Sequence, residues 1–272
     1  DKMNLEHDIQ EAGVQMILLV EDSIRFYSSI LPNLYNYILE QSKNFSQEAL
    51  NRHAATMRMR GRPKVVLART YEEAQKLYDK YSDNTLGVIS DARFPLKSAA
   101  KAFGNEVMPE EKPKHRTDTF GREKCPDAGL QLFRYIRKND PFVPLIIESS
   151  ESENRAKAEA EGFRFVDKNS KKMSVDLRRL MEEHMGFGDF IFRDPKTHEE
   201  IMRIHSLKEL QDNIFNIPND SMLYHISRNH MSRWLCARAI FPVSAFLKHV
   251  TWEKLQDVDA HRQIIFDAIV QY

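Results

Sequence analysis

At 272 residues the chain is long enough for one large domain or for two of ordinary size. Its 40 Lys and Arg residues balance its 40 Asp and Glu residues, and this neutrality argues against nucleic acid or an anionic membrane as a partner. Two cysteines are too few for a disulfide framework, and no apolar run approaches the roughly 20 residues that span a bilayer. We therefore expect a cytoplasmic protein. The start at Asp1 shows no signal-peptide pattern and suggests a segment of a longer protein.

Five short apolar runs alternate with amphipathic stretches between residues 14 and 186, which is the pattern of a parallel α/β sheet. The runs are continuous rather than alternating, as strands that are covered on both faces should be. They predict a doubly wound, five-stranded parallel sheet with strands at residues 16–20, 64–68, 86–90, 143–147 and 163–166.

The stretches between the runs carry helix signals. A helix is expected from about Ile24 with a kink at Pro32, and Thr70 with Glu73 forms a capping box for the next one. Ser152 and Ser174 begin two further helices, which Gly162 and Gly186 end. Two insertions interrupt this scheme. Residues 42–63 extend the first helix or add another, and residues 96–126 form a long loop after the third strand.

The pattern changes after residue 186. Apolar residues 190–192 and 201–204 flank the turn sequence at 194–197 and predict a β-hairpin. Helices are expected at about 207–215, 221–239 and from 252 to the end. The predicted organisation is a linker over residues 1–13, a sheet domain over 14–186 and a smaller, mostly helical module over 187–272.

Charged side chains fall at the ends of three predicted strands. Glu21 and Asp22 come directly after the first strand, Asp91 after the third, and Lys168 after the fifth. The carboxyl ends of parallel strands line the crevice where such sheets bind ligands. Three carboxylates brought together repel one another by roughly 4 kcal/mol for each pair at about 4 Å and an effective dielectric of about 20. Mg²⁺ removes that cost and binds carboxylates together with phosphate oxygens. These residues predict a magnesium-dependent pocket that accepts a phosphoryl group, with an aspartate as nucleophile.

The order of Glu21-Asp22, Asp91, Ser149 and Lys168 closely resembles that of the receiver domain of two-component response regulators. The resemblance covers residues 14–186 and implies a flavodoxin/CheY-like fold. It implies that Asp91 accepts a phosphoryl group from a histidine kinase or a small phosphodonor.

The same resemblance implies a role for each of the other matching positions. Asp22 and Asp91 would bind Mg²⁺ with the backbone carbonyl of Arg93, and Glu21 is the second acidic position of the metal site. Ser149 and Lys168 would contact the phosphoryl group, and Phe165 is the aromatic switch residue.

This chain departs from the family at several positions. Asn169 stands where receivers usually have a cis-proline, Glu148 adds a charge beside Ser149, and Arg93 occupies a position that influences dephosphorylation. The insertion at 96–126 comes shortly after the phosphoacceptor position. Two alternatives therefore stay open: a degenerate receiver that serves as a binding or dimerisation scaffold without phosphorylation, and a DNA-binding response regulator.

A second resemblance spans nearly the whole chain. It is to the regulatory region of phosphoenolpyruvate (PEP) synthase-like proteins, and four blocks carry it: residues 58–64, 165–170, 186–190 and 224–230. It implies a PEP/pyruvate-binding kinase domain C-terminal to this chain. The segment itself is then regulatory, with no catalysis beyond its own phosphorylation, and the full-length protein would be a PEP synthase- or dikinase-like kinase.

Three further features favour structural interpretations. Arg60-Gly61-Arg62-Pro63 matches the core of an AT-hook but leads into a strand, so we interpret it as a charged strand entry. His225 and His230 are a poor metal pair at five residues apart, and we expect helix-surface or interdomain packing. An apolar band between residues 223 and 241 is expected to pack inside the helical module. Its alternative use is docking of a partner domain or of a second copy of the chain in a homodimer.

Overall fold

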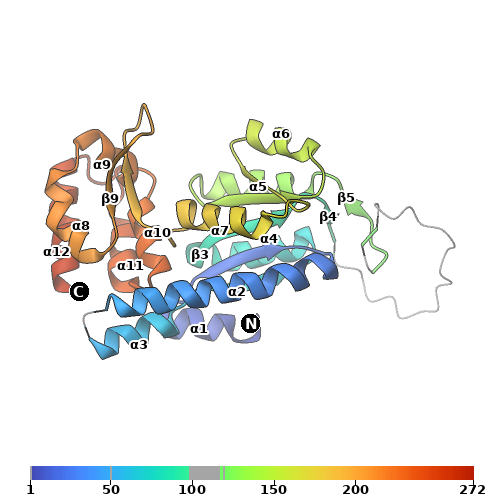
Figure 1. Cartoon of the computed structure of the whole chain (residues 1–272), viewed down its shortest axis with the longest axis horizontal. Helices are drawn as coiled ribbons and strands as arrows, with labels where there is room; N and C mark the ends of the chain where they lie inside the picture. Colours follow the sequence, from blue (N-terminus) through green and yellow to red (C-terminus); the bar gives the residue numbers. More distant parts are fainter. Residues whose placement is uncertain (1, 50, 98–116, 119) are drawn as a thin grey trace. The chain divides into compact units, whose positions relative to one another are not determined.

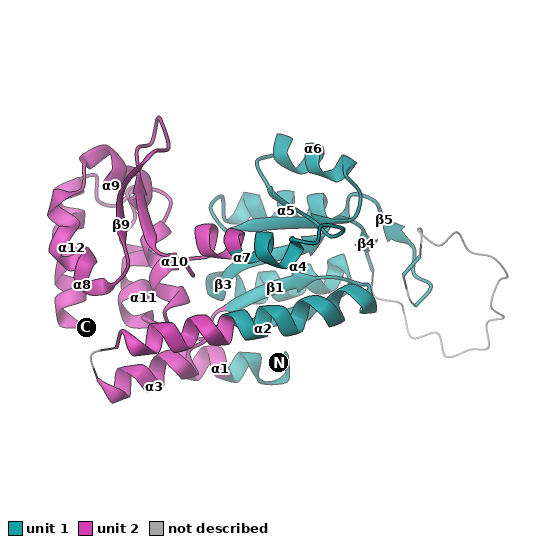
Figure 2. Cartoon of the chain, in the orientation of Figure 1, with its two compact units in different colours: residues 1–7, 16–37, 63–178 teal, residues 8–15, 38–62, 179–272 magenta. Residues whose placement is uncertain are grey.

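A computed structural model describes residues 2–49, 51–97, 117–118 and 120–272. The described chain forms two compact units, each assembled from separate segments (Figure 2). Unit 1 comprises Asp1–His7, Met16–Tyr37 and Pro63–Arg178, and unit 2 comprises Asp8–Gln15, Ile38–Arg62 and Arg179–Tyr272. The N-terminal residues, expected as a linker, form the 3₁₀ helix η1 (Lys2–Asn4) and the helix α1 (Leu5–Ala12).

Unit 1 is built on a five-stranded parallel sheet in the order β2-β1-β3-β6-β7. Figure 1 shows the elements of the chain coloured along the sequence. The strands are β1 (Met16–Val20), β2 (Lys64–Ala68), β3 (Thr85–Asp91), β6 (Leu145–Ser149) and β7 (Arg164–Asp167). Every residue of β1 and β6 is buried, as the continuous apolar runs predict. The predicted doubly wound α/β fold is confirmed, and the strand order is the flavodoxin-like one.

The helices of unit 1 connect these strands. They are the first part of α2 (Ile24–Gln47), α4 (Tyr71–Tyr81), the short η2 (Ser82–Asn84), α5 (Ala128–Asn139), α6 (Glu153–Ala160) and the start of α7 (Met173–His184). Thr70 caps α4 as predicted, because its Oγ1 accepts from Glu73 N–H at 3.2 Å, and the Glu73 carboxylate accepts from the backbone N–H of Arg69, one residue before the cap, at 2.7 Å. No helix among the described residues combines the length and apolar character that crossing a bilayer requires.

The two insertions take different forms. In the first, α2 runs on through Pro32 to Gln47 and α3 (Arg52–Arg60) comes next, so the predicted helix is extended and a further helix is added. In the second, β4 (Phe94–Pro95) pairs antiparallel with β5 (Lys124–Cys125) at the base of the predicted loop. Residues 98–116 and 119 of that loop lie outside the described residues.

Unit 2 contains the predicted hairpin, β8 (Phe190–Arg193) with β9 (Glu200–Ile204), and a set of short helices. These are α8 (Leu207–Asn213), η3 (Ile214–Asn216), α9 (Asn219–Ile226), α10 (His230–Ala237), α11 (Phe241–His249) and α12 (Val258–Gln271). Residues of the apolar band, among them Met231, Trp234 and Leu235, are buried in the core of this unit. The expected packing inside the helical module is therefore confirmed.

The long helix predicted at 221–239 is wrong, because the chain breaks it between α9 and α10. Asn229 adopts a left-handed conformation with φ of 54°, which turns the two helices against each other. The break brings His225 Nδ1 to 3.0 Å from His230 Nδ1. His225 is buried against Phe190 and Phe192, so the expected helix-surface position is also wrong.

The hydrogen bonds around the histidine pair define its tautomers. Arg193 N–H donates to His225 Nε2 at 3.2 Å, so this nitrogen carries no proton. The proton of neutral His225 is then on Nδ1 and is donated to Nδ1 of His230, which keeps its own proton on Nε2. Burial, together with Arg228, lowers the pKa of His225 to about 3, and burial, together with His225 and Arg233, lowers that of His230 to about 2. Both rings are packed as neutral groups.

Candidate functional site

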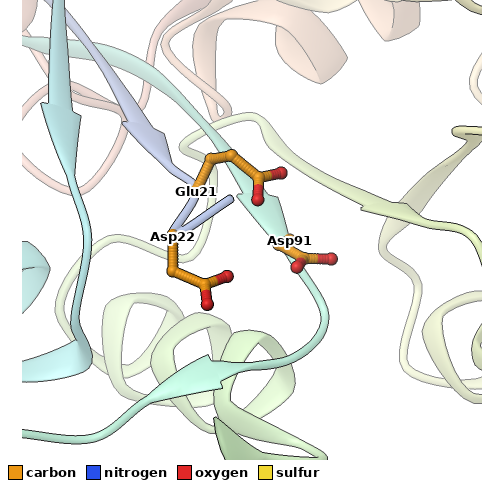
Figure 3. A group of neighbouring side chains, drawn as sticks. All are labelled: Glu21, Asp22 and Asp91. Carbon is orange, nitrogen blue, oxygen red and sulfur yellow. The ribbon is translucent and has the colours of Figure 1, made fainter. Parts of the chain in front are cut away.

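The acidic residues predicted to meet at the sheet edge do so. Glu21 and Asp22 extend from the end of β1 toward Asp91 at the end of β3 (Figure 3). One carboxylate oxygen from each of the three lies within 4.8 Å of the others. The parallel register explains this, because Val20 pairs with Ser90 and both strands therefore end at the same level.

Lys168 brings a buried ammonium group to this cluster from the end of β7. Its Nζ binds Glu21 Oε2, lies 3.0 Å from Asp91 Oδ1 and lies 3.9 Å from Glu148 Oε1. The ring of Phe26 adds a cation–π contact at 4.5 Å. With its side chain 2% exposed, Lys168 neutralises its carboxylate neighbours in a nearly dry environment.

Two charged residues complete the site beyond the predicted set. Glu148, noted in the sequence as an extra charge, is fully buried in β6 opposite Asp91. Lys124, from β5, places its Nζ 2.7 Å from Asp22 Oδ2. No sequence signal identifies Lys124, since it is one lysine in a Lys-rich stretch whose position depends on the pairing of β4 with β5.

Burial dominates the electrostatics of these carboxylates. It raises the pKa of Glu21, and the charge of Asp91 raises it further against the opposing effect of Lys168. Burial likewise raises the pKa of Glu148, with Lys168 opposing. The pKa of Asp22 is raised by burial and held back by Lys124. Burial alone would lower the pKa of the Lys168 ammonium. The charges of Asp91, Glu148 and Glu21 outweigh this effect, and the pKa is raised. Burial thus favours the protonated forms of Glu21, Glu148 and Asp22, and the two lysines oppose it by favouring the charged forms.

The donor set fits a hard divalent cation. All the ligand atoms are carboxylate oxygens, and Asp22 Oδ1 is buried without a hydrogen bond from any described residue. Mg²⁺ takes oxygen ligands at about 2.0–2.1 Å, so two of its ligand atoms lie at most about 4.2 Å apart. A cluster whose oxygens lie within 4.8 Å of one another needs little contraction to reach that geometry. The position of the Arg93 carbonyl as a further ligand stays a prediction.

Ser149 lies at the end of β6 with its hydroxyl held by two donors. Asn154 Nδ2–H donates to Ser149 Oγ at 2.9 Å, and the Glu151 backbone N–H donates to it at 3.1 Å. A hydroxyl has two acceptor lone pairs and one proton, so both lone pairs are used and the proton remains to be donated. Glu151 also accepts from Arg93 at 3.1 Å, which connects the loop after β6 with the loop after β3.

Phe165 and Asn169 flank Lys168 in the chain. Phe165 is half-buried, with the guanidinium of Arg155 lying 4.7 Å from its ring centroid. No cis peptide bond occurs among the described residues, and Asn169 Nδ2–H donates to the Ser150 carbonyl at 2.8 Å. The Asn169 side chain therefore ties the loop after β7 to the loop after β6.

The backbone around Asp91 is closely packed against the start of α5. Gly129 N–H donates to the Ala92 carbonyl at 3.1 Å, and a Cβ at Gly129 would come within 2.3 Å of the Asp91 carbonyl oxygen. Only glycine allows this approach. Gly129 therefore positions the backbone that carries Asp91.

We expect Gly129→Ala to lower the free energy of unfolding by about 1–3 kcal/mol, because the strand end or the helix must shift. Urea unfolding measures this. Gln131→Ala, at an exposed position of the same helix, is the matched control and is expected to change the value by less than about 0.5 kcal/mol. Equal stability of the Gly129 variant and the wild type would contradict the packing argument.

No family model and no curated protein matches the chain. Among solved structures, the chain is similar to a response regulator receiver domain protein from Clostridium thermocellum. The two share 17% identity with a TM-score of 0.36, over 63% of this chain and 94% of that one. It is also similar to a two component transcriptional regulator AraC from Clostridium phytofermentans ISDg, at 14% identity and a TM-score of 0.33, over 64% of this chain and 93% of that one. The fold of unit 1 is defined by its strand order and register and not by these likenesses.

Proposed function

We propose that unit 1 is a receiver domain of the two-component type and that Asp91 accepts a phosphoryl group in a Mg²⁺-dependent reaction. The observation that carries the proposal is the convergence of Glu21, Asp22 and Asp91 with a buried lysine at the carboxyl ends of the sheet. The exposures of the carboxylates support Asp91 as the acceptor. Its side chain is 13% exposed, whereas the side chains of Glu21 and Asp22 are 0% exposed. Of these three, only Asp91 can meet a donor from solvent.

In the proposed reaction a carboxylate oxygen of Asp91 attacks the phosphorus of a phosphohistidine or of a small acyl phosphate. A new P–O bond forms to Asp91 while the bond from phosphorus to the leaving group breaks, and its electron pair departs with that group. Lys168 Nζ and Ala92 N–H both bind Oδ1, so attack through Oδ2 leaves these contacts intact. Mg²⁺ held by Asp22, Asp91 and the Arg93 carbonyl would neutralise charge on the phosphoryl oxygens.

The added phosphoryl group, with a charge of about −1.5 to −2, attracts the nearest donors. Lys168 already contacts Asp91, and Ser149 retains a proton to donate. Movement of Ser149 toward the phosphoryl group would loosen its bonds from Asn154 and Glu151. Phe165, now under Arg155, would then turn inward and repack the face formed by β6, α6 and β7.

Incubation with acetyl phosphate and Mg²⁺, followed by intact mass measurement, tests the proposal. The wild type is expected to gain the mass of one phosphoryl group, which is lost again on treatment with hydroxylamine because acyl phosphates react with it. Asp91→Asn is expected to gain none, since an amide is not nucleophilic. Asp127→Asn, which changes a carboxylate outside the cluster, is the matched control and is expected to behave as the wild type. The proposal fails if the wild type stays unmodified or if the Asp91→Asn variant gains the same adduct.

The scaffold alternative is favoured by one specific observation. Lys124 already binds Asp22, and Lys168 already binds the other carboxylates, so the cluster has internal cations without a metal. A receiver of this kind would bind partners without phosphorylation. The same mass measurement separates the two functions, because the scaffold predicts an unmodified wild type.

The PEP synthase-like context stays a prediction. The blocks that carry this resemblance have structural roles in the described chain: Gly186 ends α7 with φ of 82°, and Gly61 ends α3. His225 is buried against Phe190, and His230 packs against His225. These roles explain the residues without a kinase domain. A reading frame that continues beyond Tyr272 into a PEP/pyruvate-binding domain would support the resemblance.

A further inference from the structure

Asp22 is a buried metal-ligand candidate that already has a cation of its own. Its side chain is 0% exposed, and Lys124 Nζ lies 2.7 Å from Oδ2. Lys168 is within 4.0 Å of Glu21, Asp91 and Glu148, and among the described residues no such contact joins it to Asp22. Lys168 thus contacts three of the carboxylates, and Lys124 contacts Asp22, the carboxylate that Lys168 does not reach.

The base of the insertion holds Lys124 in this position. In β5, Lys124 pairs with Pro95 and Cys125 pairs with Phe94, which is completely buried. Strand β4 begins three residues after Asp91, so the β4–β5 pair lies close in the chain to the predicted phosphoacceptor. The Lys124 side chain is only 16% exposed. Lys124 is therefore a largely buried part of the site in the metal-free chain rather than an exposed surface lysine.

A Mg²⁺ ion bound by Asp22 would come within a few ångströms of the Lys124 ammonium. Two positive groups at that distance in a partly buried site repel strongly, and both need the Asp22 carboxylate. Metal binding then requires the ammonium to move away from Asp22, and the lysine competes with the metal.

We propose that Lys124 is a built-in competitor of Mg²⁺ at Asp22 and sets the metal affinity of the site. This inference rests on the proposed function, since it concerns the same metal site. It assigns a role to the insertion that interrupts the domain after Asp91: the insertion supplies a cation to the metal site. A receiver with this lysine takes up Mg²⁺, and therefore a phosphoryl group, only at higher metal concentration than one without it.

Calorimetric titration of the whole chain with Mg²⁺, without any phosphodonor, tests the inference. Lys124→Met keeps the aliphatic stem and removes the charge, and we expect it to bind Mg²⁺ at least about tenfold more tightly than the wild type. Mg²⁺ should also raise its melting temperature by more than that of the wild type, because the metal-free variant leaves Asp22 without a counter-ion. Lys124→Gln is a second neutral variant for which the same result is expected.

Two controls separate charge from other effects. Lys124→Arg keeps the positive charge and is expected to bind Mg²⁺ as weakly as the wild type. Lys157→Met removes a lysine that contacts Asp127 at 3.1 Å outside the cluster and is expected to leave Mg²⁺ affinity unchanged.

The outcomes distinguish this inference from the proposed function. If the neutral variants bind Mg²⁺ no more tightly than the wild type while Asp91 is still phosphorylated, the role of Lys124 is wrong and the receiver function stands. If neither the wild type nor the neutral variants bind Mg²⁺, both are overturned. Binding by the neutral variants alone would support the inference in its strongest form, with Lys124 excluding the metal from the wild type.

Discussion

Replacement of Lys168 with Met is expected to lower the free energy of unfolding of unit 1 by about 3–5 kcal/mol in the absence of metal. The ammonium group is buried and contacts Glu21, Asp91 and Glu148. Its loss removes the cation that offsets the burial of these carboxyl groups, which must then stay charged without a partner or bind protons, and either outcome costs free energy. Urea unfolding at neutral pH, followed by circular dichroism, measures the loss.

The pH dependence of that loss has a defined sign. Burial raises the pKa of both Glu21 and Glu148 above the values of the unfolded chain. A carboxyl group whose pKa is higher in the folded protein than in the unfolded chain contributes stability at any pH below the pKa of the unfolded chain. This contribution is lost as the pH rises through the pKa of the folded protein. The penalty of Lys168→Met is therefore expected to shrink as the pH is lowered. Glu148→Gln in the same background should recover part of it, because one buried charge is removed.

Lys171→Met is the matched control, since Lys171 is exposed in the same unit. It is expected to change stability by less than about 0.5 kcal/mol. A loss of that small size for Lys168→Met would mean that Lys168 forms no stabilising ion pair with these carboxyl groups, and the ion-pair description of the site would be wrong.

Unit 2 is expected to lose stability in mild acid. The pKa of His225 is lowered to about 3 and that of His230 to about 2, against about 6.5 for an unperturbed imidazole. A histidine with a lowered pKa in the fold contributes stability that is present above the unfolded pKa and is lost as the pH falls below it. Between about pH 6.5 and about pH 5, the loss is roughly 2 kcal/mol for each imidazole. Protonation of His225 would also place a proton on Nε2, where Arg193 N–H donates.

Urea unfolding at a series of pH values measures this slope. His230→Gln is expected to remove about half of the acid sensitivity, because one of the two packed imidazoles no longer titrates. His249→Gln changes an exposed histidine of the same unit and is expected to keep the wild-type slope. An unchanged slope in the His230 variant would show that the acid sensitivity comes from other groups.

Features that depend on local pattern were predictable from the chain alone. The five strands were found within a few residues, because fully buried strands need continuous apolar runs. Glu21, Asp22, Asp91 and Lys168 were expected together, because parallel strands end at one edge. The helix at 221–239 was wrong because Asn229 adopts a left-handed conformation that no apolar spacing indicates. Helix α11 was missed because Phe241-Pro242 resembles a loop, although proline is well tolerated in the first turn of a helix.

The sequence by itself therefore determined the parallel strands and the acidic residues that directly follow them. Both depend on local features, namely the periodicity of apolar residues and the residues directly after each strand. Tertiary structure alone decided which charges pair. Lys168 and Glu21 are 147 residues apart in the chain, and Lys124 reaches Asp22 only because β5 pairs with β4. Ion-pair energies depend on distances of a few ångströms and on burial, and neither is encoded in local sequence pattern. The position of Lys124 beside Asp22, which no local pattern indicates, is the basis of the proposal that this lysine competes with Mg²⁺.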